Sequence, residues 1–206
     1  MQKLSVGASI RFGWETFKKR PFFLIGVVLG VMIVSGILGS LPKQQGIMTI
    51  LLTLAVLVIN ILIEMGLLSF AIKAQDDIAH LRLHDFWHPR SFWKYLGVKI
   101  LTGVIVIIGL ILLIVPGIIA ALALMFATYL IIDRDLGPIE AIKESMRLTK
   151  GNRWNLFLLI LALIGINILG AIALFVGLFV SIPVSLLALA HAYRTLAGKG
   201  VAPVSV

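Results

Sequence analysis

Long apolar stretches alternate along this chain with shorter segments rich in lysine and arginine. The apolar stretches cover residues 22–72, 96–132 and 154–197. One helical crossing of a hydrocarbon core about 30 Å thick needs only about 20 residues. Each stretch is therefore long enough for two crossings, and the pattern predicts six transmembrane segments arranged as three hairpins.

The turns of these hairpins are expected where the apolar pattern contains a helix breaker. The first stretch is interrupted by the polar segment 41–46, which contains a proline and a glycine. In the second stretch the strong break is Pro116-Gly117, so we expect the hairpin turn at Pro116 and Gly117. The second arm is short, which leaves open whether this hairpin spans fully or is re-entrant. In the third stretch we place the turn near Gly177 and expect Pro183 to kink the last helix.

The basic residues set the expected orientation. Of the 18 lysines and arginines, 17 fall into four blocks, at residues 1–20, 73–99, 134–153 and 194–199. Because basic residues beside membrane segments are retained on the cytoplasmic side, we expect all four blocks and both termini to be cytoplasmic. Neighbouring blocks must then be joined by an even number of crossings, as three hairpins provide.

Composition supports a membrane protein and argues against other classes. With 60% hydrophobic and 13% charged residues, the chain has more apolar surface than a soluble domain of 206 residues could bury. Its net charge of +9 would suggest nucleic acid as a partner, but the four blocks account for nearly all of it. The chain contains no cysteine, so disulfides and thiolate metal sites are excluded.

We therefore predict an all-α fold, a polytopic membrane helical bundle that forms one integral-membrane domain over residues 1–206. Amphipathic cytoplasmic helices are expected before the hairpins. The predicted parts are an amphipathic N-terminal segment at 1–20, hairpins at 22–72, 96–132 and 154–197, cytoplasmic segments at 73–95 and 133–153, and a tail at 198–206.

Two of the cytoplasmic segments have a helical pattern of apolar residues. Residues 138–150 start with a proline, which fits the first turn of a helix, and a glycine follows them. The second such segment is residues 4–19. We expect both helices to lie flat on the membrane surface or against the bundle. The expected apolar stripes are Ile139, Ile142 and Met146 in residues 138–150, and Val6, Ile10, Gly13, Trp14 and Phe17 in residues 4–19.

Tryptophans stand beside basic residues near the point where each hairpin would enter the membrane. Tryptophan at the headgroup level next to lysine or arginine is typical of an interfacial anchor. A basic cytoplasmic face would in addition attract anionic lipids. The predicted anchors are Trp14, Trp93, Trp154, Lys18, Lys94, Lys150 and Arg153.

Two runs of the sequence resemble a known family. Residues 137–154, GPIEAIKESMRLTKGNRW, preceded by LIVPGI at 113–118, resemble the integral-membrane domain fused to some bacterial glycerophosphodiester phosphodiesterases and its stand-alone, mostly uncharacterised relatives. The similarity covers residues 85–197 well and the first hairpin only in general pattern. It implies a multi-pass protein of the bacterial cytoplasmic (inner) membrane. It implies no catalytic residue, because the fused proteins carry their activity in a separate soluble barrel.

A few polar residues inside the apolar stretches are candidates for function. Glu64 lies deep in the first stretch, with Asn60 one helical turn away, and an ionisable group at that depth is costly. Such a residue either serves a function or locks two helices together through His191 or a lysine. Asn167 and His191 are further polar residues that either serve a function or help to pack the helices. Gly26 and Gly30 match the small-xxx-small spacing, which we interpret as helix packing within the chain.

The most tempting cluster for chemistry is formed by acidic residues and histidines of the second cytoplasmic segment. In a helix, Asp76, His80 and His84 would share one face, as metal ligands could. The alternative is that the preceding helix ends near Asp76 and is followed by a loop and a short capped helix. We favour this alternative because no further carboxylate or cysteine stands at a spacing that would complete a metal site with these three residues. The remaining members are Asp77 and His88. We predict no metal and no cofactor.

The function that these patterns favour is non-enzymatic. We expect an inner-membrane protein that interacts with membrane lipids, anionic ones in particular, or with a protein partner or further copies of itself, and not with nucleic acid. A role in envelope lipid homeostasis is implied by the resemblance alone. The alternatives are a small transporter or channel that uses Glu64 and Asn60, and, third, a membrane-embedded lipid enzyme.

Overall fold

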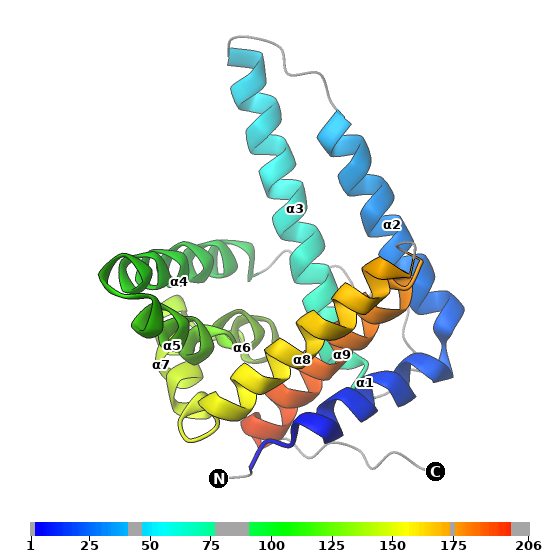
Figure 1. The fold of residues 1–206 in the computed structure, drawn as a ribbon. Helices are drawn as coiled ribbons and strands as arrows, with labels where there is room; N and C mark the ends of the chain where they lie inside the picture. The colour runs from blue at the N-terminus through cyan, green and yellow to red at the C-terminus, as the bar shows by residue number, and fades with distance from the viewer. Residues whose placement is uncertain (1–2, 41–46, 77–90, 174–175, 199–206) are drawn as a thin grey trace.

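The computed structural model describes residues 3–40, 47–76, 91–173 and 176–198. Within these ranges the regular structure is helical and contains no strand. Figure 1 shows the helices and both termini. The helices are α1 (Val6–Lys19), α2 (Pro21–Ser40), α3 (Ile47–Lys73), α4 (Phe92–Leu112), α5 (Ile114–Leu124), α6 (Ala127–Arg134), α7 (Pro138–Thr149), α8 (Arg153–Ile172) and α9 (Leu178–Ala197).

Five helical segments of the described chain are long and apolar enough to cross a membrane. They are α3, α4, the run Ile114–Arg134 that joins α5 to α6, α8 and α9. A sixth results if α1 and α2, which meet at an angle of 98°, are taken together as one bent span. The predicted all-α membrane class is confirmed, and the number of candidate spans is five to six.

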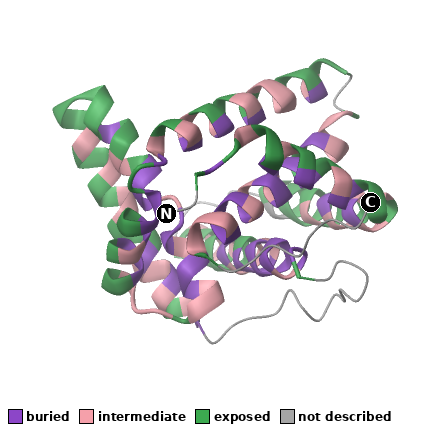
Figure 2. Cartoon of the chain, turned by 90° about the horizontal axis from the view of Figure 1, so that it is seen from below, coloured by how far each residue is buried: buried purple, intermediate pink, exposed green. Residues whose placement is uncertain are grey.

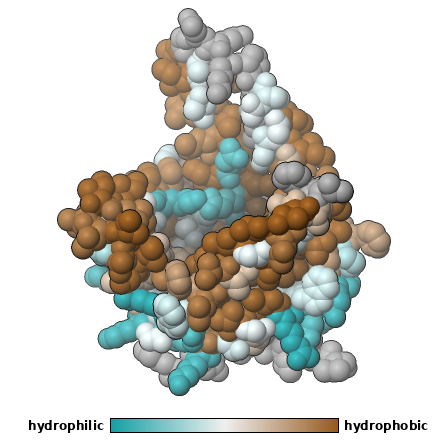
Figure 3. Space-filling model, in the orientation of Figure 1, coloured by the Kyte–Doolittle hydropathy of each residue, from teal (hydrophilic) through white to brown (hydrophobic). Residues whose placement is uncertain are grey.

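Apolar side chains cover much of the outside of the molecule. Figure 3 shows them over α3, α4 and α8, while most polar side chains gather along the lower edge of this view. Ile107, Ile111 and Leu169, for example, are more than half exposed. Exposed apolar surface on this scale is what a lipid environment would cover.

Helix α9 occupies the centre of the bundle. Its side chains pack against α1, α2, α3 and α8, and the main core also contains residues of α4 to α7. Leu187, Ala188 and Tyr193 of α9 are completely buried. Figure 2 shows the buried residues facing the interior of the bundle. The predicted turn before α9 is in place, since this helix begins directly after Gly177 and contains Pro183.

The chain between α4 and α5 turns earlier than the sequence predicts. Leu113 alone has an extended conformation, with φ −162° and ψ 147°, and α5 already begins at Ile114. Pro116 and Gly117 therefore lie in the first turns of α5, where a proline needs no amide partner. Gly117 allows a close approach, because a Cβ there would lie 2.7 Å from the backbone nitrogen of Leu110.

The buried face of α7 is also rotated relative to the prediction. Ile142 is buried as expected, but Ile139 is 61% exposed and Met146 46% exposed. Ser145 and Thr149 are completely buried in their place. Ile139 and Met146 thus lie outside the core, which leaves contact with the membrane surface as their prediction, and Ser145 and Thr149 can be buried because their hydroxyl groups are hydrogen-bonded.

The hydroxyl groups of α7 fill the break between α5 and α6. Ser145 Oγ accepts a hydrogen bond from the Phe126 backbone N–H at 3.2 Å and donates to the Ala123 carbonyl at 2.8 Å. The Thr149 hydroxyl donates to the same carbonyl at 3.3 Å. Broken helices within a membrane need such substitute partners for their backbone groups. Helix α7 thus completes the α5–α6 segment.

Helix α1 packs directly on α9. A Cβ at Gly13 would lie 2.5 Å from the Val184 carbonyl oxygen, so the two helices meet closely at this glycine. Phe12 and Phe17 are buried, whereas Trp14 is 46% exposed. Of the predicted stripe, Gly13 and Phe17 face the bundle, whereas Trp14 points outward, which is compatible with its predicted role as an interfacial anchor.

Candidate functional site

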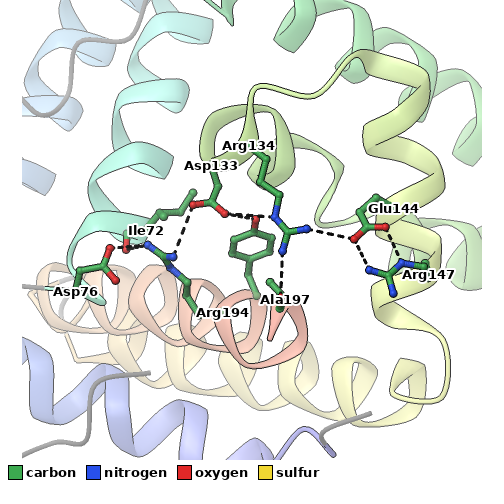
Figure 4. A network of polar contacts seen from close by, with 9 residues as sticks. Ile72, Asp76, Asp133, Arg134, Glu144, Arg147, Arg194 and Ala197 are labelled. Carbon is green, nitrogen blue, oxygen red and sulfur yellow. Dashed lines mark hydrogen bonds and ion pairs between the residues drawn. The ribbon is translucent and has the colours of Figure 1, made fainter. Parts of the chain in front are cut away.

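A network of charged side chains joins the ends of α3, α6 and α9 (Figure 4). At its centre Arg194 of α9 lies 2.6 Å from a carboxylate oxygen of Asp76 and 3.7 Å from one of Asp133. The Tyr193 hydroxyl donates to the second oxygen of Asp133 at 2.7 Å. The side chains of Arg194 and Asp133 are only 9% and 6% exposed. A nearly buried charge pair thus connects the last helix to α6.

The network continues through Arg134 to α7. The Arg134 guanidinium lies 3.3 Å from Glu144 and donates to the Ala197 carbonyl at 3.1 Å, at the end of α9. Glu144 in turn accepts from Arg147 at 2.5 and 2.7 Å. These two arginines, Arg147 first, hold the pKa of the Glu144 carboxyl below its usual range.

Among the described residues, the network contains as many carboxylates as guanidinium groups. Arg194 also donates to the Ile72 carbonyl at the end of α3 at 3.4 Å. Paired charges with several hydrogen bonds can remain buried, whereas a single charge could not. The arrangement holds the ends of α3, α6, α7 and α9 in one geometry. Its six charged members are Asp76, Asp133, Arg134, Glu144, Arg147 and Arg194.

This network was not predicted, because Arg134 and Arg194 were assigned to the basic cytoplasmic blocks. In the structure both guanidinium groups bond to carboxylates of other helices. One signal was available: Asp133-Arg134 and Tyr193-Arg194 each place a polar pair directly at the end of an apolar helix. Such pairs at helix ends can meet when the helices pack side by side.

Glu64 forms an ion pair between α3 and α4. Its carboxylate accepts from the Lys99 ammonium group, which also lies 6.0 Å from the centre of the Tyr95 ring. The two side chains are 48% and 40% exposed. Asn60 donates instead to the Val56 carbonyl of its own helix at 2.9 Å. Glu64 thus links α3 to α4, with a lysine, Lys99, as the partner.

His191 and Asn167 also connect helices. His191 of α9 lies 3.2 Å from the Ser9 hydroxyl of α1, and its ring is 4.5 Å from that of Phe12. The Asn167 amide of α8 donates to the Ser185 hydroxyl of α9 at 3.0 Å. Both residues hold α9 against a neighbour.

The predicted tryptophan anchors are all exposed. Trp14, Trp93 and Trp154 expose 46%, 79% and 69% of their surface. Each indole contacts a neighbouring phenylalanine ring of its own helix, with centroids 5.5 to 6.0 Å apart. Trp93 and Trp154 are the second residues of α4 and α8. The three side chains therefore stand outside the core, two of them at helix starts.

The basic residues among the predicted anchors differ in their exposure. Lys18 and Lys150 are exposed, and Arg153 is partly buried. Lys94 is half-exposed and lies 2.9 Å from both the carboxylate and the carbonyl oxygen of Asp135. Lys94 thus ties α4 to the end of α6.

The predicted cluster of acidic residues and histidines lies mostly outside the described residues. Only Asp76 is described, and it pairs with Arg194. Across the described ranges, no group of three or more acidic or histidine side chains has the geometry of a metal site.

Comparisons with known proteins give relatives without an assigned activity. The chain is 28% identical over 163 residues to uncharacterised proteins of Mycobacterium bovis and Mycobacterium tuberculosis. This similarity covers 77% of the chain and 49% of each relative, so the chain spans about half the length of these proteins. No solved structure matches the chain.

The family is shown by a match over most of the chain. The sequence profile of a protein of unknown function, DUF975, matches residues 47–199, from the start of α3 to the end of α9. This match includes the runs at 113–118 and 137–154 on which the family resemblance was noted. It supports the expected uncharacterised membrane family and leaves the link to phosphodiesterase-fused domains as a prediction. The chain belongs to the DUF975 family.

Proposed function

We propose that this protein is a non-enzymatic module of the bacterial inner membrane that binds anionic lipids through its basic, tryptophan-bearing side. The observation that carries the proposal is the exposure of Trp14, Trp93 and Trp154 beside lysines and arginines. An exposed tryptophan near a cation is suited to the headgroup region, and Trp93 and Trp154 stand at the starts of apolar helices.

The charge distribution supports the same proposal. Arg134, Arg194 and Lys94 are paired with carboxylates, so they contribute little net charge to a lipid surface. Lys18 and Lys150 are exposed. Each exposed cation near an anionic leaflet contributes about 1 kcal/mol. A role in envelope lipid homeostasis, which the family resemblance suggests, would use this attraction.

The proposed orientation has α7 and both ends of the described chain on the cytoplasmic side, because the basic blocks lie there. The chain has no cysteine, so single cysteines can be introduced without background labelling. We expect a cysteine at Lys150 to be labelled by an impermeant maleimide only after the cells are opened. We expect a cysteine at Met48, at the opposite end of α3 from Lys73, to be labelled in intact cells. The reverse pattern would contradict the orientation.

Lipid preference is the direct test of the proposed function. The full chain, reconstituted in nanodiscs of mixed phosphatidylglycerol and phosphatidylcholine, should enrich phosphatidylglycerol among the lipids retained after gentle detergent extraction. Enrichment should fall at about 1 M salt, because exposed charges are then screened within about 3 Å. Mass spectrometry of the retained lipids gives the ratio.

A pair of variants provides the control. Lys150→Gln with Arg153→Gln should lower the enrichment several-fold. Lys43→Gln changes the one lysine outside the four basic blocks and should leave the ratio unchanged. Equal retention of both lipids by the wild-type protein, at low and high salt alike, would contradict the proposal.

A further inference from the structure

An apolar groove lies between α2 and α3. It has a volume of about 590 Å³, and its lining includes Phe22, Phe23, Gly26 and Gly30 of α2 together with Ile59 and Ile63 of α3. The two helices diverge away from the rest of the bundle in Figure 1, and the groove opens between them. Its size is in the range of sites that hold one small molecule.

Basic residues precede the groove along the chain, and one of them contacts its lining. The Arg20 guanidinium lies 4.9 Å from the centre of the Phe23 ring, which lines the groove. Phe23 also contacts Phe70 of α3, with ring centroids 5.9 Å apart. Lys18 and Lys19, in the last turn of α1, are exposed. A positive cluster thus stands where an apolar groove begins.

The bend between α1 and α2 gives this arrangement the geometry of a lipid site. The helices meet at 98°, so α2 leaves the end of α1 nearly at a right angle, and the groove begins two residues after Arg20. By the rule for basic residues beside membrane segments, we expect the cluster of Lys18, Lys19 and Arg20 to lie at headgroup depth. The groove runs from it toward the hydrocarbon core.

We infer that the groove between α2 and α3 seats an acyl chain of one anionic phospholipid whose headgroup lies on Lys18, Lys19 and Arg20. This inference rests on the proposed function and deepens it, because it assigns one lipid to one site. The charge complementarity between a phosphate-bearing headgroup and the three cations identifies the class of ligand.

The glycines of the groove are open to a ligand. Gly26 and Gly30 were expected to pack against a neighbouring helix of the chain. In the structure, a Cβ added at either position would have no atom within 4 Å. A glycine row gives the groove a smooth floor, along which a flexible chain can lie.

Filling the groove is the test. Gly26→Leu with Gly30→Leu places two side chains in open space, so the fold should tolerate the change while the acyl chain is excluded. Gly36→Leu is the matched control, because Gly36 is on the same helix, also has no atom within 4 Å of an added Cβ, and does not line the groove. Full-length proteins are compared in nanodiscs by native mass spectrometry with phosphatidylglycerol and with phosphatidylcholine of the same chains.

The wild-type protein and Gly36→Leu should retain one tightly held phosphatidylglycerol. In the double leucine variant the affinity for this lipid should fall by about tenfold or more. Lys18→Gln with Lys19→Gln should weaken the same lipid by roughly fivefold for each lysine and leave phosphatidylcholine unchanged. A circular dichroism spectrum and thermal melt like those of the wild type would show that each variant is folded.

Three results would overturn the inference. One is equal retention of the lipid by the double leucine variant and the wild type; if both still prefer phosphatidylglycerol, the proposed function stands and only this site is wrong. Another is loss of a dimer, in place of a lipid, when the groove is filled, which would make a second copy the occupant. The third is the absence of any lipid preference in the wild type, and it would remove the proposed function as well.

Discussion

Replacing Arg194 with methionine should destabilise the protein by about 3 kcal/mol, more than any single change at its surface. The substitution keeps a side chain of similar size but leaves the Asp133 carboxylate, which is only 6% exposed, without its charged partner from α9. It also removes the donor to the Ile72 carbonyl. Arg134, at 3.8 Å from Asp133, can compensate in part. Unfolding by denaturant in detergent micelles, followed by circular dichroism, measures the change.

Asp76→Asn provides the control for this prediction. The Asp76 side chain is 65% exposed, so loss of its charge should cost no more than about 1 kcal/mol, although its contact with Arg194 is shorter. A double-mutant cycle between Arg194→Met and Asp133→Asn should show coupling, because the second change then removes a charge that already lacks its partner. Equal stabilities of Arg194→Met and Asp76→Asn would show that the buried pair is not what holds these helix ends together.

Helices and their ends could be predicted from the sequence where a local signal exists. Pro138 starts α7, and Gly151, with φ +82°, follows its end, as the proline and glycine at these positions indicate. Gly177 precedes α9 as expected. These features depend on residues within a few positions of one another, so their physical causes are visible along the chain.

The direction in which a side chain points could not be predicted in the same way. The rule for basic residues places Arg194 on the cytoplasmic side but does not say whether it faces lipid or protein. Its partner Asp133 is 61 residues away, and Tyr193 reaches the same carboxylate. Likewise, the burial of Ser145 depends on the break at Ala123 and Phe126, which it fills. Such contacts exist only after the helices pack.

The position of the turn between α4 and α5 was missed for a related reason. Pro116 and Gly117 form the strongest breaker pair in this stretch, yet a proline is tolerated in the first turn of a helix. The glycine is required for packing. Both residues therefore lie within the first turns of α5, which begins at Ile114, and the single extended residue Leu113 makes the turn.

The substitution Gly117→Val tests this interpretation and should be among the most damaging single changes in the membrane region. A Cβ at Gly117 would lie 2.5 Å from the Leu110 side chain and 2.7 Å from its backbone nitrogen, so α4 and α5 must move apart. Overpacking of this kind costs about 1–3 kcal/mol. We expect a value at the upper end, because backbone atoms, unlike side chains, cannot relieve a clash by changing rotamer. Thermal unfolding in detergent should show the loss.

Gly103→Val is the matched control, because it makes the same chemical change on α4 at a position with no atom within 4 Å of an added Cβ. Valine and glycine differ little in their cost to a helix, so propensity cancels between the two variants. If Gly117 served only as a flexible turn residue, as the sequence pattern suggests, valine would strain the turn and the two helices could still pack elsewhere. If it is the contact point, an alanine at Leu110 should restore part of the stability that Gly117→Val removes, because the side-chain clash is then relieved while the backbone contact remains.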